Sequence, residues 1–316
     1  MILGTTQGDA EAQAEKTQAE ACATLRAMTS APRTKSATIT SRDNRWLKHF
    51  RMALRGGLPT ESGSVGVEGM RLVEEALASG CRIEAVLFSE SGTRHRSKLS
   101  PLVDRPEMGF PVLQTTDRLF EGVADTEHPQ GVAALVVPQQ PQLEDLFSAP
   151  EGKCSPLLVV LAGVQDPGNV GTILRTAAAF GATGAVTSAT GQSGTASPFS
   201  PKALRASAGA ALHLLVVHGA SLGILLTQFK LNGISTIATC VHEGGAAHTP
   251  VAPWEIDWCQ PIALLVGNEG AGLPEDVVHS ADARIHIPLE RQVESLNAAA
   301  AAAVLFYEAF RQRQGK

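Results

Sequence analysis

The sequence predicts an α/β protein with two domains, the second of which contains a parallel sheet. The C-terminal half alternates short apolar segments with helical stretches, a pattern typical of parallel α/β sheets. The region before it has a smaller set of helix and strand patterns, and prolines are concentrated between the two regions. With 316 residues, 44% of them hydrophobic, the chain is longer than one average domain and can bury a sizeable core.

Residues 1–40 are predicted to be a disordered tail. They are rich in Ala, Thr, Gln and Ser and contain few large apolar side chains, so they cannot bury enough surface to become ordered. The segment from Arg26 to Arg42 has Arg, Ser and Thr without acids and resembles a transit peptide, but four acidic residues precede it. The segment fits a transit peptide, which implies import into an organelle. It fits equally well a start codon assigned too far upstream, with translation beginning at Met28.

Residues 41–137 are predicted to form a smaller α/β domain. From Glu68 to Ser79 the apolar residues recur at helical spacing, and Gly80 follows as a helix-ending residue. Two apolar segments, Ile83–Phe88 and Val132–Val137, have the length and composition of buried strands. A compact unit of helices and strands is therefore expected before the proline-rich region.

Residues 138–156 contain four prolines and are predicted to be a linker to a second domain, residues 157–316. Five apolar segments of this domain are expected to be strands: Leu157–Leu161, Gly184–Val186, Leu214–Val217, Ser235–Ala238 and Ile262–Val266. The last helix is expected over Ser295–Arg313, where six consecutive alanines allow a close approach to neighbouring elements.

Composition excludes several classes of protein. No window has the roughly 18 consecutive apolar residues that a membrane span needs. The five cysteines are scattered without a C-x-x-C pair, so neither a disulfide framework nor a bound metal is expected, and a reducing, cytoplasmic location fits. A net charge of −5 argues against indiscriminate nucleic-acid binding. Five basic residues between Arg42 and Arg55 nevertheless fit a solvated helix face and RNA contact equally well.

Three clusters in the second domain could carry chemistry. In Asn169–Ala177, Asn169 is well placed to cap a helix, and Arg175 is a long cation in an otherwise apolar segment. In Gly267–Leu273, glycines follow the most apolar strand and permit close backbone approach to a ligand. Their spacing is not that of the dinucleotide fingerprint, and a P-loop is absent from the sequence, so an oxidoreductase or a kinase is disfavoured. The third cluster, within Ile287–Asn297, includes Ser295, which could be only a helix cap.

Together, and in this order, the three clusters resemble the three motifs of the SpoU (TrmH) family of RNA ribose 2'-O-methyltransferases, part of the SPOUT superfamily. In the first region, Ser41-x-x-Asn44-x-x-x-Lys48, the segment Val67–Ala76 and the segment Asp125–Gly131 resemble a ribosomal-protein-like substrate-binding domain. One departure is that the uncharged or acidic segment Gly56–Gly63 replaces a usual basic stretch.

The resemblance implies a trefoil knot, S-adenosylmethionine as methyl donor, rRNA or tRNA as substrate, and a homodimer. The catalytic residues that it implies are Arg175, Asn169, Glu269, Ser295 and Asn297. The donor-binding residues that it implies are Gly267, Asn268, Gly270, Gly272, Ile287, Pro288, Leu289 and Leu296. The expected RNA contacts are Arg42, Asn44, Arg45, Lys48, Lys202 and Arg205, with a solvated helix face as the equal alternative for the last two.

The chemistry of ribose methylation favours one role for Arg175. The ribose hydroxyl must lose a proton as it attacks the methyl group, and it lies beside a phosphate. A guanidinium stays protonated at neutral pH and is a poor base, whereas it grips a phosphate well. Electrostatic positioning is therefore favoured over the proton abstraction that accounts of the family also propose. The alternative function is that of a catalytically inactive RNA-binding protein of the same fold.

Overall fold

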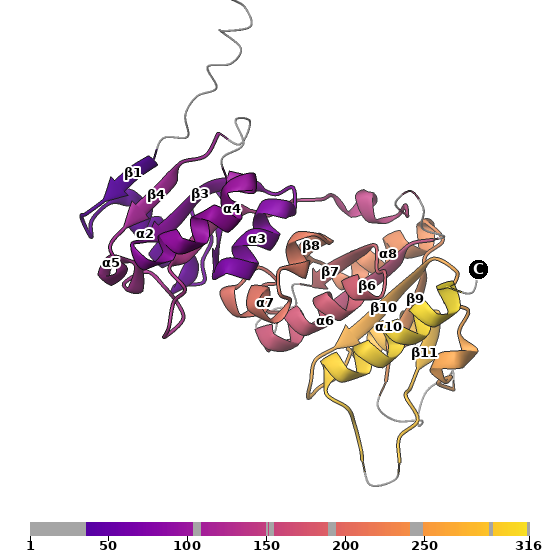
Figure 1. The fold of residues 1–316 in the computed structure, drawn as a ribbon. Helices are drawn as coiled ribbons and strands as arrows, with labels where there is room; N and C mark the ends of the chain where they lie inside the picture. Colours follow the sequence, from indigo (N-terminus) through magenta and orange to yellow (C-terminus); the bar gives the residue numbers. More distant parts are fainter. Residues whose placement is uncertain are drawn as a thin grey trace, which may run out of the picture.

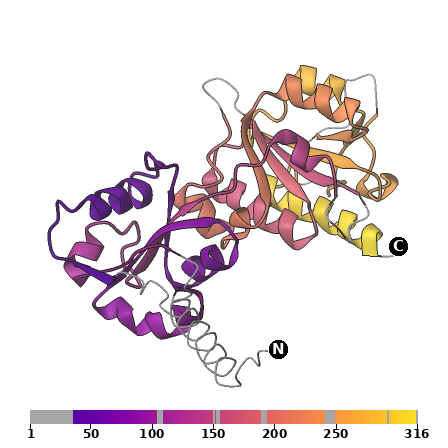
Figure 2. The same cartoon turned by 90° about the horizontal axis from the view of Figure 1, so that it is seen from above.

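The computed structural model describes residues 36–103, 109–149, 151, 155–188, 194–240, 249–290 and 293–314. They form two α/β domains, each built on its own sheet (Figures 1 and 2). Residues 1–35, most of the predicted tail, lie outside the described residues. Among the residues that are described, no helix has the length and apolar character needed to cross a bilayer.

The first domain has a five-stranded sheet with the order β1-β4-β3-β5-β2. Its strands are β1 (Ser36–Ile39), β2 (Val65–Glu68), β3 (Arg82–Ser89), β4 (Val112–Thr115) and β5 (Val132–Val137). Its helices are α2 (Arg45–Leu54), α3 (Met70–Ala78), η1 (Ser91–His95), α4 (Arg96–Val103) and α5 (Asp117–Glu121). Strand β5 pairs antiparallel with β2 and β3, and the other pairs are parallel.

The first domain begins earlier than the sequence indicated. Residues 36–39, which were placed in the tail, form β1 and pair in parallel with Val112–Thr115. Ile39 is buried, and the Thr115 hydroxyl donates to its carbonyl oxygen at 2.9 Å. A strand of four residues with one large apolar side chain has too weak a pattern to be separated from a polar tail by sequence alone.

The second domain has a six-stranded sheet in which every pair is parallel, with the order β11-β9-β10-β6-β7-β8. The strands are β6 (Leu157–Ala162), β7 (Gly184–Ser188), β8 (Leu215–Ala220), β9 (Ser235–Thr239), β10 (Ile262–Gly267) and β11 (Ala283–Ile285). The five predicted strands and the parallel sheet are confirmed. The central pair, β6 and β10, is buried at every position, which explains their continuous apolar sequences.

Helices cover both faces of this sheet. They are α6 (Pro167–Ala179), α7 (Pro201–Ala206), α8 (Leu222–Leu231), α9 (Glu275–Ser280) and α10 (Ala298–Gln314). Short 3-10 helices lie at η3 (Leu143–Leu146), η5 (Ala210–Leu212) and η6 (Pro253–Glu255). Helices α6 and α10 pack side by side on one face, where Val159 contacts their apolar residues (Figure 1). Val160 points to the other face, which α8 and α9 cover.

The two domains meet at α7, which packs against both α6 and β2. An Arg205 Nη2 atom lies 2.8 Å from an Asp125 carboxylate oxygen of the first domain. His213 Nε2 lies 3.0 Å from Glu75, also of the first domain. In the expected linker, Leu146 of η3 is buried against the sheet of the second domain. Side chains of both domains therefore fix the junction, and part of the linker belongs to the second core.

Candidate active site

The candidate site lies where β6, β9 and β10 end. Parallel strands place their carboxyl ends at one edge of a sheet, and open α/β sheets bind ligands beyond that edge. The chain leaves β6 toward the start of α6, and it leaves β10 in the turn from Asn268 to Gly272, whose backbones exchange two hydrogen bonds of 3.0 Å. The side chain of Asn268 shapes this turn, because its Oδ1 accepts from two backbone amides and its Nδ2 donates to the Gly163 carbonyl oxygen at 2.8 Å.

A cavity of about 500 Å³ lies against this turn. Most of the donor-binding residues inferred from the sequence line it: Gly267, Asn268, Gly270, Gly272, Ile287, Leu289 and Leu296. Glu269 and Ser295 also line it, whereas Pro288 is not among the described lining residues. Its volume falls within the range of about 300–1,000 Å³ that small-molecule sites occupy.

The structure adds cavity residues that sequence reasoning missed. Thr239 ends β9 and Cys240 follows it, and Ala301, Ala302 and Leu305 come from α10. Burial raises the pKa of the Cys240 thiol, against a smaller opposing effect of Arg284. Because β9 lies next to β10 in the sheet, the residues that end both strands meet at the same edge. The sequence could not predict these cavity residues, because apolar periodicity predicts the strands but not which strands are neighbours in the sheet.

Gly267, at the end of β10, and Gly272, at the end of the turn, are required for different steric reasons. A Cβ on Gly267 would lie 2.4 Å from the carbonyl carbon of Gly272, in backbone that cannot rotate away. Gly272 itself has a φ of 72°, in the left-handed region that glycine adopts without strain. The cavity wall is therefore formed by backbone segments packed closer than side chains would permit.

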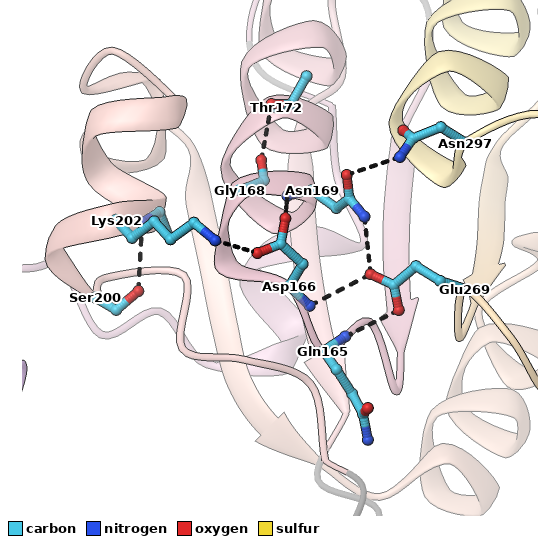
Figure 3. A network of polar contacts seen from close by, with 10 residues as sticks. Gln165, Asp166, Gly168, Asn169, Thr172, Ser200, Lys202, Glu269 and Asn297 are labelled. Carbon is cyan, nitrogen blue, oxygen red and sulfur yellow. Dashed lines mark hydrogen bonds and ion pairs between the residues drawn. The ribbon is translucent and has the colours of Figure 1, made fainter.

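A network of hydrogen bonds joins all three sequence clusters (Figure 3). The Glu269 carboxylate accepts from the backbone amides of Gln165 and Asp166 at 3.2 and 3.3 Å, and from Asn169 Nδ2 at 2.9 Å. Asn169 Oδ1 in turn accepts from Asn297 Nδ2 at 3.2 Å. The turn after β10, the start of α6 and the start of α10 are thus linked through the Asn169 amide.

This network keeps Glu269 ionised. Partial burial alone would raise the pKa of its carboxyl group, but the hydrogen bonds from Asn169 and the backbone amides outweigh burial and lower it. The carboxylate is acceptor-only in this state, so the Asn169 side chain must direct its NH2 group toward Glu269. Its carbonyl oxygen then faces Asn297, as the contacts show.

Two helix caps differ from the sequence expectation. Asn169 was expected to cap α6, but the helix begins at Pro167 and the Asp166 side chain caps it, accepting from the Asn169 backbone amide at 3.2 Å. Proline fits the first helical position because its missing N–H needs no partner there. Ser295 was considered as the cap of α10, but Asn297 Oδ1 accepts from the amides of Ala299 and Ala300 at 2.9 and 3.4 Å.

Arg175 is exposed on α6, on the same helix as Asn169. Among the described residues, its side chain takes part in neither a hydrogen bond nor an ion pair. Its guanidinium therefore differs from the Lys202 ammonium, which pairs with the Asp166 carboxylate. Five donors in a rigid fork remain available for a phosphate or a carboxylate ligand.

The six residues expected to contact RNA fall into two groups. In the first domain, Asn44 caps α2 by accepting from the Trp46 amide at 2.9 Å, and the Arg45 guanidinium lies 5.2 Å from the centre of the Trp46 ring. Arg42 and Lys48 are exposed beside them. On α7, Lys202 pairs with Asp166 and Arg205 pairs with Asp125. RNA contact by all six stays a prediction.

Comparisons with known proteins match this arrangement. Residues 156–307 match the family described as "SpoU rRNA Methylase family", and residues 60–134 match the family described as "MRM3-like substrate binding domain". The 23S rRNA (guanosine(2553)-2'-O)-methyltransferase RlmP of Bacillus subtilis is 34% identical over 249 residues, covering 78% of this chain and 89% of RlmP. An uncharacterised tRNA/rRNA methyltransferase of Synechocystis is 34% identical over 278 residues, covering 88% of this chain and 94% of the relative.

Solved structures agree in fold. The AdoMet-bound rRNA methyltransferase of Sinorhizobium meliloti superposes with a TM-score of 0.71 at 28% identity, covering 87% of this chain and 98% of the other. The SpoU methyltransferase AviRb of Streptomyces viridochromogenes gives 0.71 at 26% identity, covering 86% and 98% of the two chains. The predicted fold class is confirmed. With relatives of this identity matched over nearly their whole length, the chain belongs to the SpoU rRNA methylase family.

Proposed function

We propose that this protein transfers the methyl group of S-adenosylmethionine to a ribose 2'-hydroxyl of a nucleotide in rRNA or tRNA. The observation that carries the proposal is the network of Glu269, Asn169 and Asn297 beside the cavity, because it joins the three sequence clusters. The curated relative RlmP is named as a 2'-O-methyltransferase, and the Sinorhizobium meliloti structure is named as AdoMet-bound. Both support the same chemistry here.

The cavity fits the methyl donor in size and in chemistry. Backbone at Gly267 and Gly272 offers hydrogen-bonding groups without side chains in front of them, which suits an adenosine. Apolar side chains of Ile287, Leu289 and Leu296 line the same cavity and suit a purine ring. When bound, S-adenosylmethionine supplies an electrophilic methyl group on a sulfonium.

Arg175 is proposed to hold the RNA phosphate next to the target ribose. Its guanidinium stays protonated at neutral pH, so it can position the hydroxyl and stabilise the negative charge that develops on it. Within the described residues, no carboxylate competes for it. Asn169, Glu269, Ser295 and Asn297 are proposed to complete the site, with Glu269 fixing the orientation of the Asn169 amide.

The proposal includes a homodimer. Val304 and Tyr307 lie three residues apart on α10 and are 43% and 56% exposed, and Val293, in the segment before the helix, is 49% exposed. Tyr307 also makes an edge contact with Phe180, with ring centres 5.7 Å apart. A second copy of this chain is the proposed occupant of this surface. Sedimentation of Tyr307→Glu against the unmodified protein tests it, with a shift to monomer expected.

The test of the reaction is transfer of labelled methyl to unmodified rRNA and tRNA pools, followed by digestion to nucleosides. Label in a 2'-O-methylnucleoside with the unmodified protein, and its loss in Arg175→Ala with unchanged donor affinity, is the expected result. Lys230→Ala is the matched control, because Lys230 is an exposed cation on α8, across the sheet. Label only in base-methylated nucleosides would contradict the proposal. Absence of donor binding would leave the function of an inactive RNA-binding protein.

A further inference from the structure

Asp166 contacts the hydrogen-bond network of the site, although it precedes the first sequence cluster, which begins at Asn169. One carboxylate oxygen accepts from the Asn169 backbone amide at 3.2 Å. Its own backbone amide donates to Glu269 at 3.3 Å. The other carboxylate oxygen pairs with Lys202 Nζ at 2.5 Å (Figure 3). Asp166 therefore contacts two members of the network and one residue of α7.

The space for this ion pair is built into the backbone. A Cβ on Gly168 would lie 2.7 Å from Asp166 Oδ2 and 3.5 Å from the Lys202 Cε atom. Lys202 is held in the first turn of α7, which Ser200 caps and which packs against α6. The starts of the two helices therefore face each other, and the carboxylate of one meets the ammonium of the other.

The ion pair between Asp166 and Lys202 affects the placement of these side chains more than the folding stability of the protein. The Lys202 side chain is 62% exposed and that of Asp166 45%, and exposed ion pairs add little to folding free energy. Bonding to Lys202 lowers the pKa of Asp166, so this carboxylate is ionised at neutral pH. A carboxylate held on one side by Lys202 is restricted in the direction from which it accepts the Asn169 amide. Asn169 is thus fixed at its backbone by Asp166 and at its side chain by Glu269 and Asn297.

We propose that Asp166, held in place by Lys202, is a positioning residue for methyl transfer that acts through Asn169. The inference rests on the proposed function. It assigns Lys202 to the alignment of the site, whereas the sequence left a phosphate contact and a solvated helix face as equal alternatives.

Steady-state kinetics at saturating donor test this assignment. Asp166→Ala is expected to lower kcat about tenfold, since small misplacements of site residues have large effects on rate. The KM for RNA is expected to stay within about threefold. Asp166→Asn keeps an acceptor for the Asn169 amide and should recover part of the loss. Lys202→Met should lower kcat with an unchanged salt dependence of RNA binding.

Glu308→Gln, which breaks the ion pair with Arg311 on α10, is the control.

The opposite result for Lys202 would overturn the assignment. If Lys202→Met raises KM, leaves kcat unchanged and reduces the salt slope of RNA binding by about one, Lys202 contacts a phosphate. Amide hydrogen exchange in residues 165–175, without RNA or donor, gives a readout besides activity. Asp166→Ala should exchange about fivefold faster there, the usual effect of a lost cap. Unchanged exchange, while the unmodified protein transfers methyl, would also overturn it. Absence of transfer by the unmodified protein would overturn the proposed function instead.

Discussion

Replacing Gly267 with alanine should reduce affinity for S-adenosylmethionine strongly. The new Cβ would lie 2.4 Å from the Gly272 carbonyl carbon, 2.5 Å from the Leu273 nitrogen and 2.7 Å from the Gly272 carbonyl oxygen. Ordinary contact begins at 3.4 Å, so the turn after β10 must move by about 1.0 Å. All three atoms are backbone, so rotation of a side chain cannot relieve the clash.

The size of the effect follows from this displacement. Overpacking of a well-packed site costs about 1–3 kcal/mol. If the turn bears that strain in the donor complex, Kd rises about fivefold to 150-fold. Titration calorimetry with S-adenosylmethionine measures it directly. Gly223→Ala is the matched control, because a Cβ there meets nothing within 4 Å. Donor binding by Gly267→Ala within about threefold of the unmodified protein, at unchanged melting temperature, would contradict the close packing described for this turn.

Three further predictions concern the same domain. Asn268→Ala removes a side chain that makes hydrogen bonds to two amides and one carbonyl, so donor affinity measured by calorimetry should fall about tenfold or more. Arg313→Ala removes hydrogen bonds from α10 to the carbonyls of Ser155, Trp258 and Gln260. The loss of about 2 kcal/mol of folding free energy should lower the melting temperature by about 4–8 °C. Arg311→Ala loses only the ion pair with Glu308 and should lower the melting temperature much less. Both Asp166 and Glu269 have lowered pKa values, so the stability that they contribute is present above their unfolded values near pH 4 and is lost as pH falls through the lower folded values. Acid unfolding monitored by circular dichroism should therefore lose part of its pH dependence below about pH 4 in Glu269→Gln.

The sequence predicted the second domain well because its signals are local. Strands β6 and β10 are buried on both faces, so their apolar runs need no knowledge of their neighbours. Most of the donor-binding residues implied by the resemblance to the SpoU family also line the cavity, Gly267 and Asn268 among them, whereas the cavity residues from β9, Cys240 and α10 were missed.

What sequence could not give depends on contacts between distant segments. Asp166 and Lys202 are 36 residues apart, and only the packing of α7 on α6 brings them together. The choice of helix cap failed for a related reason: Asp166 and Asn169 both have side chains suited to capping, and the position of Pro167 decides between them. Strand β1 is recognised only through its pairing with β4.

The arrangement at α7 limits how this protein can be rebuilt from parts. Arg205 and His213 belong to the second domain, yet their acidic partners, Asp125 and Glu75, belong to the first. A chimera that exchanges the first domain for that of a relative must bring matching acids at both positions, or leave the Arg205 guanidinium and the His213 ring facing a foreign surface. Three residues before Arg205 in the chain, Lys202 pairs with Asp166 beside Asn169. Exchange of the first domain therefore also changes the surroundings of α7, the helix whose first turn pairs with Asp166 beside the site.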